Sequence, residues 1–144
     1  MKFNHDISKL KDVITSAQHI VILTHYNPDG DAIGSSTAWL HYLQTIGKQV
    51  RFVVPNDFPQ NLKWINGSET AVIGNQKLEE AKKIISEADL MICNDFQSFS
   101  RIDVLEEQAL KAKAFKILVD HHIEPDTEQF DLIFSFTNIS STSE

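Results

Sequence analysis

The sequence predicts an α/β domain with a mostly parallel sheet, on the evidence of its hydrophobic pattern and the spacing of its segments. Short, continuous apolar runs alternate with longer segments that have helical character. Runs without polar alternation are typical of parallel strands that are buried on both faces. The connections are short, so right-handed crossovers are expected between the strands. We therefore expect the 144 residues to form one α/β domain.

Helical segments are expected at four places in the chain. In order, they cover residues 3–18, 32–46, 76–88 and 101–114. In the first segment the apolar residues recur at helical spacing, and Asp6 or Ser8 can cap it by accepting backbone N–H bonds. Gly47 follows the second segment at the position usual for a C-cap. Residues 141–144, Ser-Thr-Ser-Glu, form a capping-box pattern that predicts the start of another helix.

The apolar runs between these helices are expected to be the strands. They cover residues 19–24, 49–54, 71–73, 89–94, 115–119 and 131–136. Pro55 ends the second run, and a loop-like region follows it up to residue 70. The pattern contains no internal repeat, low-complexity tract or linker.

Composition and charge exclude several classes of protein. No apolar run approaches the roughly 18 residues needed to span a membrane, so no membrane association is expected. The single cysteine, Cys93, cannot form an internal disulfide, and the N-terminus does not resemble a signal peptide, which together favour a cytoplasmic protein. The net charge of −7 argues against binding of long duplex nucleic acid through its phosphates.

Acidic residues and histidines follow three of the expected strands. They are His25, Asp29 and Asp31 after the first strand; Asp95 after the fourth; and Asp120, His121 and His122 after the fifth. Ligands collect at the carboxyl ends of strands in open α/β sheets, so these side chains are expected to form one polynuclear metal site. A Pro-Asp-Gly-Asp sequence alone is also an ordinary turn, but the coincidence of three such strand ends favours the metal site.

The ligand types indicate which metal the site would hold. Carboxylates suit Mg²⁺ and Mn²⁺, and imidazole suits transition metals. The mixture of the two without a thiolate points to Mn²⁺, with Mg²⁺ or Co²⁺ as alternatives.

These motifs resemble those of the DHH phosphoesterase superfamily. The pattern is His25-Tyr-Asn-Pro-Asp29-Gly-Asp31-Ala-Ile-Gly-Ser, then the lone Asp95, then Asp-His-His. Together with the Ser-Thr-Ser-Glu sequence at residues 141–144, it most resembles the nano-RNase/pAp phosphatase branch, often labelled exopolyphosphatase-related or RecJ-like. The resemblance implies a three-layer α/β/α domain with a five-stranded, mostly parallel sheet, a di-manganese centre and phosphoester hydrolysis.

The resemblance also implies how the ligands divide between two ions. His25, Asp29 and Asp95 would hold the first ion, and Asp31, Asp95 and His121 the second, so that Asp95 bridges the two. Two such ions, roughly 3.5–4 Å apart, share and activate a water that attacks phosphorus.

Other residues are assigned to the substrate. By the same resemblance, His122 would bind or polarise the phosphate, and Asp120 would orient the histidines. From their residue types and positions, Arg101 and Ser35 are candidates to bind substrate, because Arg suits bidentate phosphate binding and helix N-termini favour anions.

Family members supply a further Asp ligand and a separate C-terminal substrate-binding domain from later segments. Residues 1–144 are therefore expected to be a truncated DHH catalytic domain without that second domain, and activity is expected of the complete protein rather than of this chain alone.

We therefore expect a Mn²⁺-dependent phosphoesterase that acts on short oligoribonucleotides, on 3′-phosphoadenosine 5′-phosphate, or on both. Pyrophosphate or polyphosphate hydrolysis and cyclic-dinucleotide cleavage are alternatives within the same chemistry. A non-catalytic metal- or nucleotide-binding module is the alternative of another class. The expected partner is a short oligoribonucleotide or nucleotide, and homodimer formation is left open.

Overall fold

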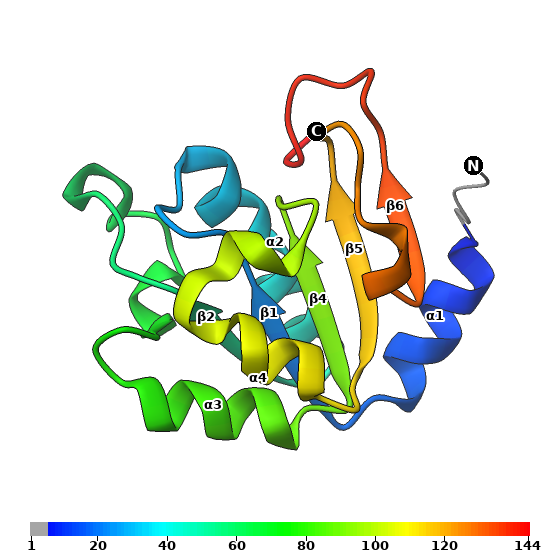
Figure 1. Cartoon of the computed structure of the whole chain (residues 1–144), viewed down its shortest axis with the longest axis horizontal. Coiled ribbons are helices and arrows are strands. Elements are labelled where there is room, and N and C mark those ends of the chain that lie inside the picture. Colours follow the sequence, from blue (N-terminus) through cyan, green and yellow to red (C-terminus); the bar gives the residue numbers. More distant parts are fainter. Residues whose placement is uncertain (1–5) are drawn as a thin grey trace.

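One parallel sheet runs through the computed structural model, which describes residues 6–144 (Figure 1). Within that range it has six strands in the order β3-β2-β1-β4-β5-β6. The strands are β1 His19–Leu23, β2 Gln49–Val54, β3 Val72–Ile73, β4 Leu90–Asn94, β5 Phe115–Asp120 and β6 Leu132–Ser135. The mostly parallel sheet is confirmed, with one strand more than the resemblance implies, because the short runs at both edges pair with their neighbours.

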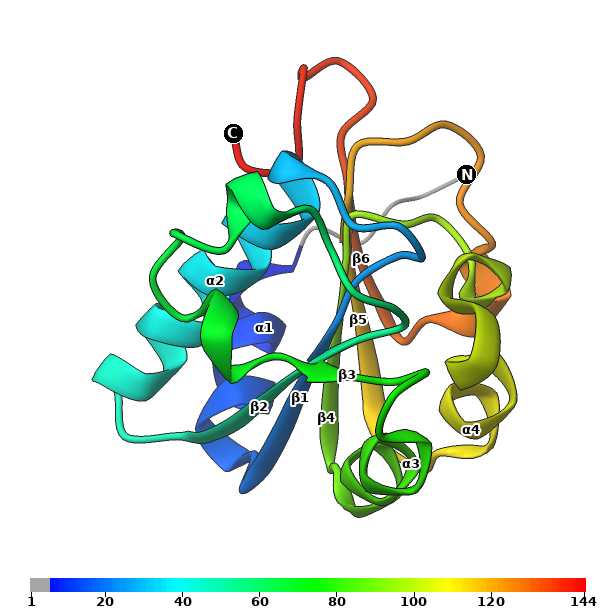
Figure 2. The ribbon, with the colours of Figure 1, turned by 90° about the vertical axis from the view of Figure 1, so that its left-hand side faces the viewer.

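Helices cover both faces of this sheet and make the expected three layers. They are α1 Ile7–Ser16, α2 Gly30–Thr45, α3 Leu78–Glu87 and α4 Glu106–Lys111. Figure 2 shows α1 and α2 on one side of the sheet and α3 and α4 on the other. Short 3₁₀ segments, η1 Gln60–Leu62, η2 Ser68–Thr70, η3 Phe99–Leu105 and η4 Thr127–Gln129, lie in the connections.

The ends of the helices show which of the predicted capping and boundary residues are used. Asp6 caps α1, since its carboxylate accepts a bond from the backbone N–H of Lys9 at 2.9 Å. The helix expected over residues 3–18 is thus shorter, and its first residues, 3–5, lie outside the described range. The helix expected from residue 101 starts only at Glu106, because Asp103 has a left-handed φ of 48° that interrupts it.

The core lies on both faces of the sheet, as expected for strands without polar alternation. Ile20 and Ile22 of β1 pack toward α1 and α2, whereas Val21 and Leu23 belong to the core beneath α3 and α4. Cys93 is fully buried in this second core, and its burial raises the pKa of the thiol well above the usual range. The cysteine is therefore an inert packing residue.

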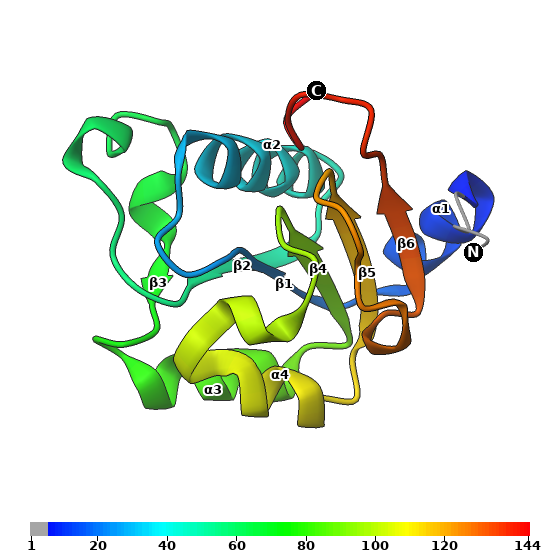
Figure 3. The same cartoon turned by 45° about the horizontal axis from the view of Figure 1, so that its top comes forward.

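The strand order reverses between β1 and β4, the two central strands. β2 and β3 lie on one side of β1, and β4, β5 and β6 follow on the other. Figure 3 shows β4, β5 and β6 side by side, with their arrowheads at one edge of the sheet. Such a reversal places a crevice at the carboxyl ends of the central strands, where ligands bind in open α/β sheets. None of the helices in residues 6–144 has the length and apolar character needed to cross a membrane.

Candidate metal centre

The turn between β1 and α2 presents His25 and Asp29. His25 Nδ1 lies 2.7 Å from the carbonyl oxygen of Tyr26, which can only accept, so the ring proton is on Nδ1. The lone pair of His25 Nε2 is therefore free for a metal ion. Asp29 caps α2 through a bond of 3.0 Å from the backbone N–H of Ala32, and it orients its carboxylate at the helix start.

Asp95 lies between two pairs of candidate ligands. We call His25 with Asp29 the first half of the centre, and Asp31 with His121 the second half; Asp95 belongs to both. It follows β4 directly, is 2% exposed and adopts a left-handed φ of 64°, while its N–H bonds the Val119 carbonyl of β5 at 2.9 Å. Its two carboxylate oxygens face different histidines. Oδ2 lies 3.6 Å from His25 Nε2, and Oδ1 lies 3.5 Å from His121 Nε2. This is the arrangement of a carboxylate that bridges two ions.

The distances suit cations between these atoms. In the first half, Asp29 Oδ1 is 3.9 Å from His25 Nε2, and in the second half Asp31 Oδ2 is 3.5 Å from His121 Nε2. Two ligand atoms that are each about 2.1 Å from one ion lie roughly 3.0–3.5 Å apart in octahedral or tetrahedral geometry. The spacings of 3.5 Å in the second half match this range, and those of 3.6 and 3.9 Å in the first half are slightly wider, so a small inward shift of the side chains would let both halves hold divalent ions.

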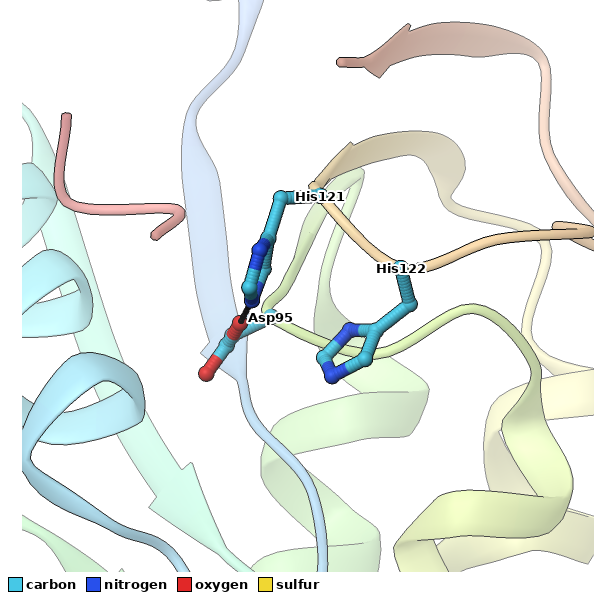
Figure 4. A group of neighbouring side chains, drawn as sticks. All are labelled: Asp95, His121 and His122. Carbon is cyan, nitrogen blue, oxygen red and sulfur yellow. Dashed lines mark ion pairs between the residues drawn. The ribbon is translucent and has the colours of Figure 1, made fainter. Parts of the chain in front are cut away.

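His121 and His122 follow β5 and have different surroundings. Figure 4 shows the His121 ring meeting the Asp95 carboxylate. His122 Nδ1 lies 2.6 Å from Asp120 Oδ1, and its backbone N–H also bonds the Asp120 carboxylate at 3.1 Å. Asp120 is 1% exposed, so it fixes the His122 ring and leaves Nε2 available. Asp95, His121 and His122 also place ligand atoms within 4.8 Å of one another, which makes His122 an alternative ligand of the second ion.

The segment after β6 donates hydrogen bonds to the carboxylates of the second half. The backbone N–H groups of Thr142 and Ser143 each bond an Asp31 oxygen at 2.8 Å, and Ser143 Oγ donates to Asp31 Oδ1 at 2.6 Å. Thr142 Oγ1 donates to Asp95 Oδ1 at 2.7 Å. Figure 2 shows this C-terminal segment, in red, beside the start of α2. The sequence predicts a helix start at Ser-Thr-Ser-Glu, but its local pattern does not predict these contacts with Asp31 and Asp95.

These contacts and the burial of the site shift two pKa values. Partial burial would raise the pKa of Asp31, but the hydrogen bonds from Ser143 and Thr142 lower it further, so the net shift is downward. Burial would lower the pKa of His25, but the facing Asp95 carboxylate, the Tyr26 carbonyl and the Asp29 carboxylate raise it overall. The acidic charge around His25 is the charge that a bound cation would neutralise.

Arg101 lies beside the first half of the centre. A cavity of about 430 Å³ is lined by His25, Tyr26, Asn27, Ser100, Arg101 and Asp103. The exposed Arg101 guanidinium has no hydrogen-bond or ion-pair partner within residues 6–144, so it is available to an anion.

Ser35 does not line the cavity near Arg101; it lies at the wall of a separate cavity of about 590 Å³ between α1, α2 and the C-terminal segment. It is 5% exposed, and its hydroxyl is engaged by Asp31 and Asn94. Substrate binding by Arg101 and Ser35 stays a prediction.

The comparison with known families settles where the chain belongs. The model of the DHH family, N-terminal domain, matches residues 19–144. The chain belongs to the DHH family. The matched range includes the residues that converge on the centre described above, from the ends of β1, β4 and β5.

Solved structures share the fold of this DHH domain. An exopolyphosphatase-related protein from Bacteroides fragilis superposes with a TM-score of 0.92 at 39% identity, over 94% of this chain and 40% of the other. An α-glucosyltransferase in complex with UDP and DNA gives a TM-score of 0.60 at 18% identity, over 83% of this chain and 38% of the other, which shows the fold alone. The DHH domain thus spans 40% of the length of the Bacteroides protein. No curated protein matches the sequence.

Proposed function

We propose that this DHH domain is the catalytic part of a Mn²⁺-dependent phosphoesterase that hydrolyses short oligoribonucleotides, 3′-phosphoadenosine 5′-phosphate, or both. The observation that carries the proposal is the Asp95 carboxylate, whose two oxygens face His25 and His121 at 3.6 and 3.5 Å. Each oxygen is placed to share an ion with the histidine that it faces. A carboxylate shared between two imidazole groups is suited to two ions side by side.

The metal type follows from the donor set. Each half combines one imidazole with two carboxylates, and the described part of the site has no thiolate. Imidazole nitrogen is a poorer ligand for Mg²⁺ than for transition metals, and carboxylate oxygen favours hard ions. Mn²⁺ satisfies both preferences, and Mg²⁺ or Co²⁺ would be substitutes.

The residues divide the chemistry among them. Two bound ions would supply an activated water and neutralise charge on the phosphoryl oxygens. Asp95 sets the spacing between the halves because its position is fixed by β4 and by the bond to Val119. His122 presents Nε2 toward a phosphate oxygen, since Asp120 holds Nδ1. The Arg101 guanidinium is suited to bind a second phosphate oxygen as the substrate enters the adjacent cavity.

Hydrolysis of pyrophosphate, polyphosphate or a cyclic dinucleotide is the second candidate. The description of the Bacteroides protein as exopolyphosphatase-related favours the polyphosphate reaction. The same centre serves all of these substrates, because each reaction is attack of water on phosphorus. The substrate is decided by the walls of the cleft rather than by the ions.

Hydrolysis of a substrate panel by the purified chain with Mn²⁺ tests the proposal. The panel contains a short RNA, 3′-phosphoadenosine 5′-phosphate, pyrophosphate, polyphosphate and a cyclic dinucleotide, and bound metal is measured in the same samples. Asp95→Asn should abolish turnover, whereas the matched surface change Asp126→Asn should not. Bound metal without turnover of any substrate would leave the metal centre in place and assign turnover to the further segments that family members supply, with a non-catalytic binding module as the alternative. Absence of bound metal in the wild-type chain would contradict the proposal.

A further inference from the structure

A buried amide lies directly before the bridging carboxylate. Asn94 is the last residue of β4 and is fully buried. Its Nδ2 donates to Ser35 Oγ at 2.6 Å and to Ser36 Oγ at 3.1 Å, both on α2. Both hydrogens of the amide are thus used, and the side chain ties the central strand to the helix above it.

The hydrogen bonds continue from Ser35 to a metal-ligand candidate. Ser35 Oγ donates to the backbone carbonyl of Asp31 at 2.6 Å. Because this hydroxyl gives its own proton to Asp31, it accepts from Asn94, which also fixes the orientation of the Asn94 amide. An unbroken series of bonds therefore runs from the residue beside Asp95 to the backbone of Asp31.

The series begins at Asn94, the neighbour of Asp95, and ends at Asp31. It therefore links the positions of the two acidic residues of the second half of the centre. Asp31 Oδ2 and Asp95 Oδ1 both lie 3.5 Å from His121 Nε2. The series of bonds crosses from β4 to α2 beneath them. It sets how far the first turn of α2 lies from the end of β4, and so how far apart the two carboxylates are.

Fold stability alone does not account for an amide at this place. Asn94 Oδ1 has no hydrogen-bond partner within residues 6–144, and the residues that precede Asn94 on the same face of β4, Leu90 and Ile92, are apolar core residues. A buried polar atom without a partner is unfavourable for folding. An apolar residue would suit the core at least as well, so the donated bonds are the reason for the amide.

We infer that Asn94 is a positioning residue of the second metal site, and that it acts through Ser35 on Asp31. The inference rests on the proposed function, since it assumes that Asp31, Asp95 and His121 hold an ion. Asn94 touches neither substrate nor metal in this role. It keeps the second site at the geometry an ion needs, and it reaches the first site only indirectly, through the start of α2 that Asp29 caps.

The test compares Mn²⁺ binding by the wild-type chain and Asn94→Leu, which has a similar shape but no polar atoms. Outer-shell changes typically weaken metal affinity by about 10–100-fold, and we expect a loss of this size at the second site and a clearly smaller one at the first. The electron paramagnetic resonance spectrum should change from that of coupled Mn²⁺ pairs to that of single ions. The unfolding temperature of the metal-free variant should be no lower than that of the wild type.

Ser35→Ala tests the same series of bonds by a smaller change. It should weaken the second site in the same direction, and the double variant should lose little more than either single one, because the residues act in series. Thr24→Val is the matched control. Thr24 Oγ1 is also buried without a partner in residues 6–144, at the neighbouring strand end, but it has no bond to Asp31.

The outcomes separate this inference from the proposed function. Two ions bound by Asn94→Leu with wild-type affinities would overturn the inference and leave the function standing. Equal loss at both sites, or an equal effect of Thr24→Val, would show a general structural role and would also overturn it. Failure of the wild-type chain to bind any Mn²⁺ would contradict the proposed function itself.

Discussion

The two halves of the centre share Asp95 but are built in different ways. The first half takes His25 and Asp29 from one short turn; the Asp29 side chain is 65% exposed, and His25 lines the cavity near Arg101. The second half takes Asp31 from α2 and His121 from the end of β5, and the Asp31 side chain is only 18% exposed. The two ligands other than Asp95 thus come from one turn in the first half and from distant segments in the second, and the exposure of the aspartates differs, although the His25 side chain is more enclosed than that of His121, at 10% against 23%.

This difference indicates how each half depends on the rest of the fold. The first needs little more than the turn after β1 and the end of β4. The second also needs Thr142 and Ser143 to hold Asp31, and Asn94 to hold α2 against β4. Changes remote in sequence should therefore affect the second half and leave the first unchanged.

The largest effect on metal binding and hydrolysis is expected from replacement of Asp95, which both halves share. Asp95→Ala removes the carboxylate that faces both histidines, so both ions should be lost. Hydrolysis should fall by at least about 10³-fold, since bound metal supplies several kcal/mol of transition-state stabilisation and 1.36 kcal/mol corresponds to tenfold. Metal content and turnover measured on the same sample check this. Retention of two ions would show that Asp95 is not shared.

Replacement of the histidine of one half should remove the ion of that half and leave the other ion bound. His25→Ala is expected to lose the first ion and keep the second, and His121→Ala the reverse, because each ring faces only one side of Asp95. Each variant should bind one ion, and turnover should fall by about 10²-fold or more, as activation of a shared water needs both. Isothermal titration with Mn²⁺ gives the stoichiometry. Loss of both ions from either variant would show that the halves bind cooperatively.

A smaller effect is expected from the C-terminal segment. Thr142→Val keeps the shape of the side chain but removes the hydrogen bond to Asp95 Oδ1. The affinity of the second ion should fall about tenfold, and that of the first should hardly change. Thr45→Val, at the far end of α2, is the control in the same titration. An equal loss at both ions would contradict the division of the centre into two halves.

The smallest effect on the centre is expected from the cap of α1. Asp6→Ala removes the bond to the Lys9 N–H and should reduce the free energy of unfolding by about 1 kcal/mol. Because α1 provides none of the ligand candidates, both ions should bind as in the wild type. Chemical denaturation and metal titration measure the two quantities separately. A change in metal binding would show that the centre depends on the outer helix layer.

The sequence predicted most of the fold because the signals were local. Continuous apolar runs gave all the strands, and the strand ends brought His25, Asp95 and His121 together as expected. The interruption before α4 was missed because Asp103 fits a helical pattern and reveals its left-handed backbone only in three dimensions.

The surroundings of the ligands could not be predicted in the same way. Thr142 reaches Asp95 across 47 positions, and Ser143 reaches Asp31 across 112. Asn94 stood in the sequence as the end of an apolar run, with nothing to mark it as a hydrogen-bond donor to α2. Contacts of this kind depend on how layers pack, and no local pattern encodes them.

Three residues around the centre adopt a left-handed backbone conformation, which lowers the stability of the domain, and one of them, Asp95, is needed for the proposed metal binding. Asn27, Asp95 and Asp103, none of them glycine, have φ values of 54°, 64° and 48°, and each such conformation costs roughly 1–3 kcal/mol. Glycine would relieve this strain at any of the three positions. At Asp95, however, glycine would also remove the carboxylate that both histidines face. Selection for a more thermostable domain should therefore change residues 27 and 103 readily and leave residue 95 as it is.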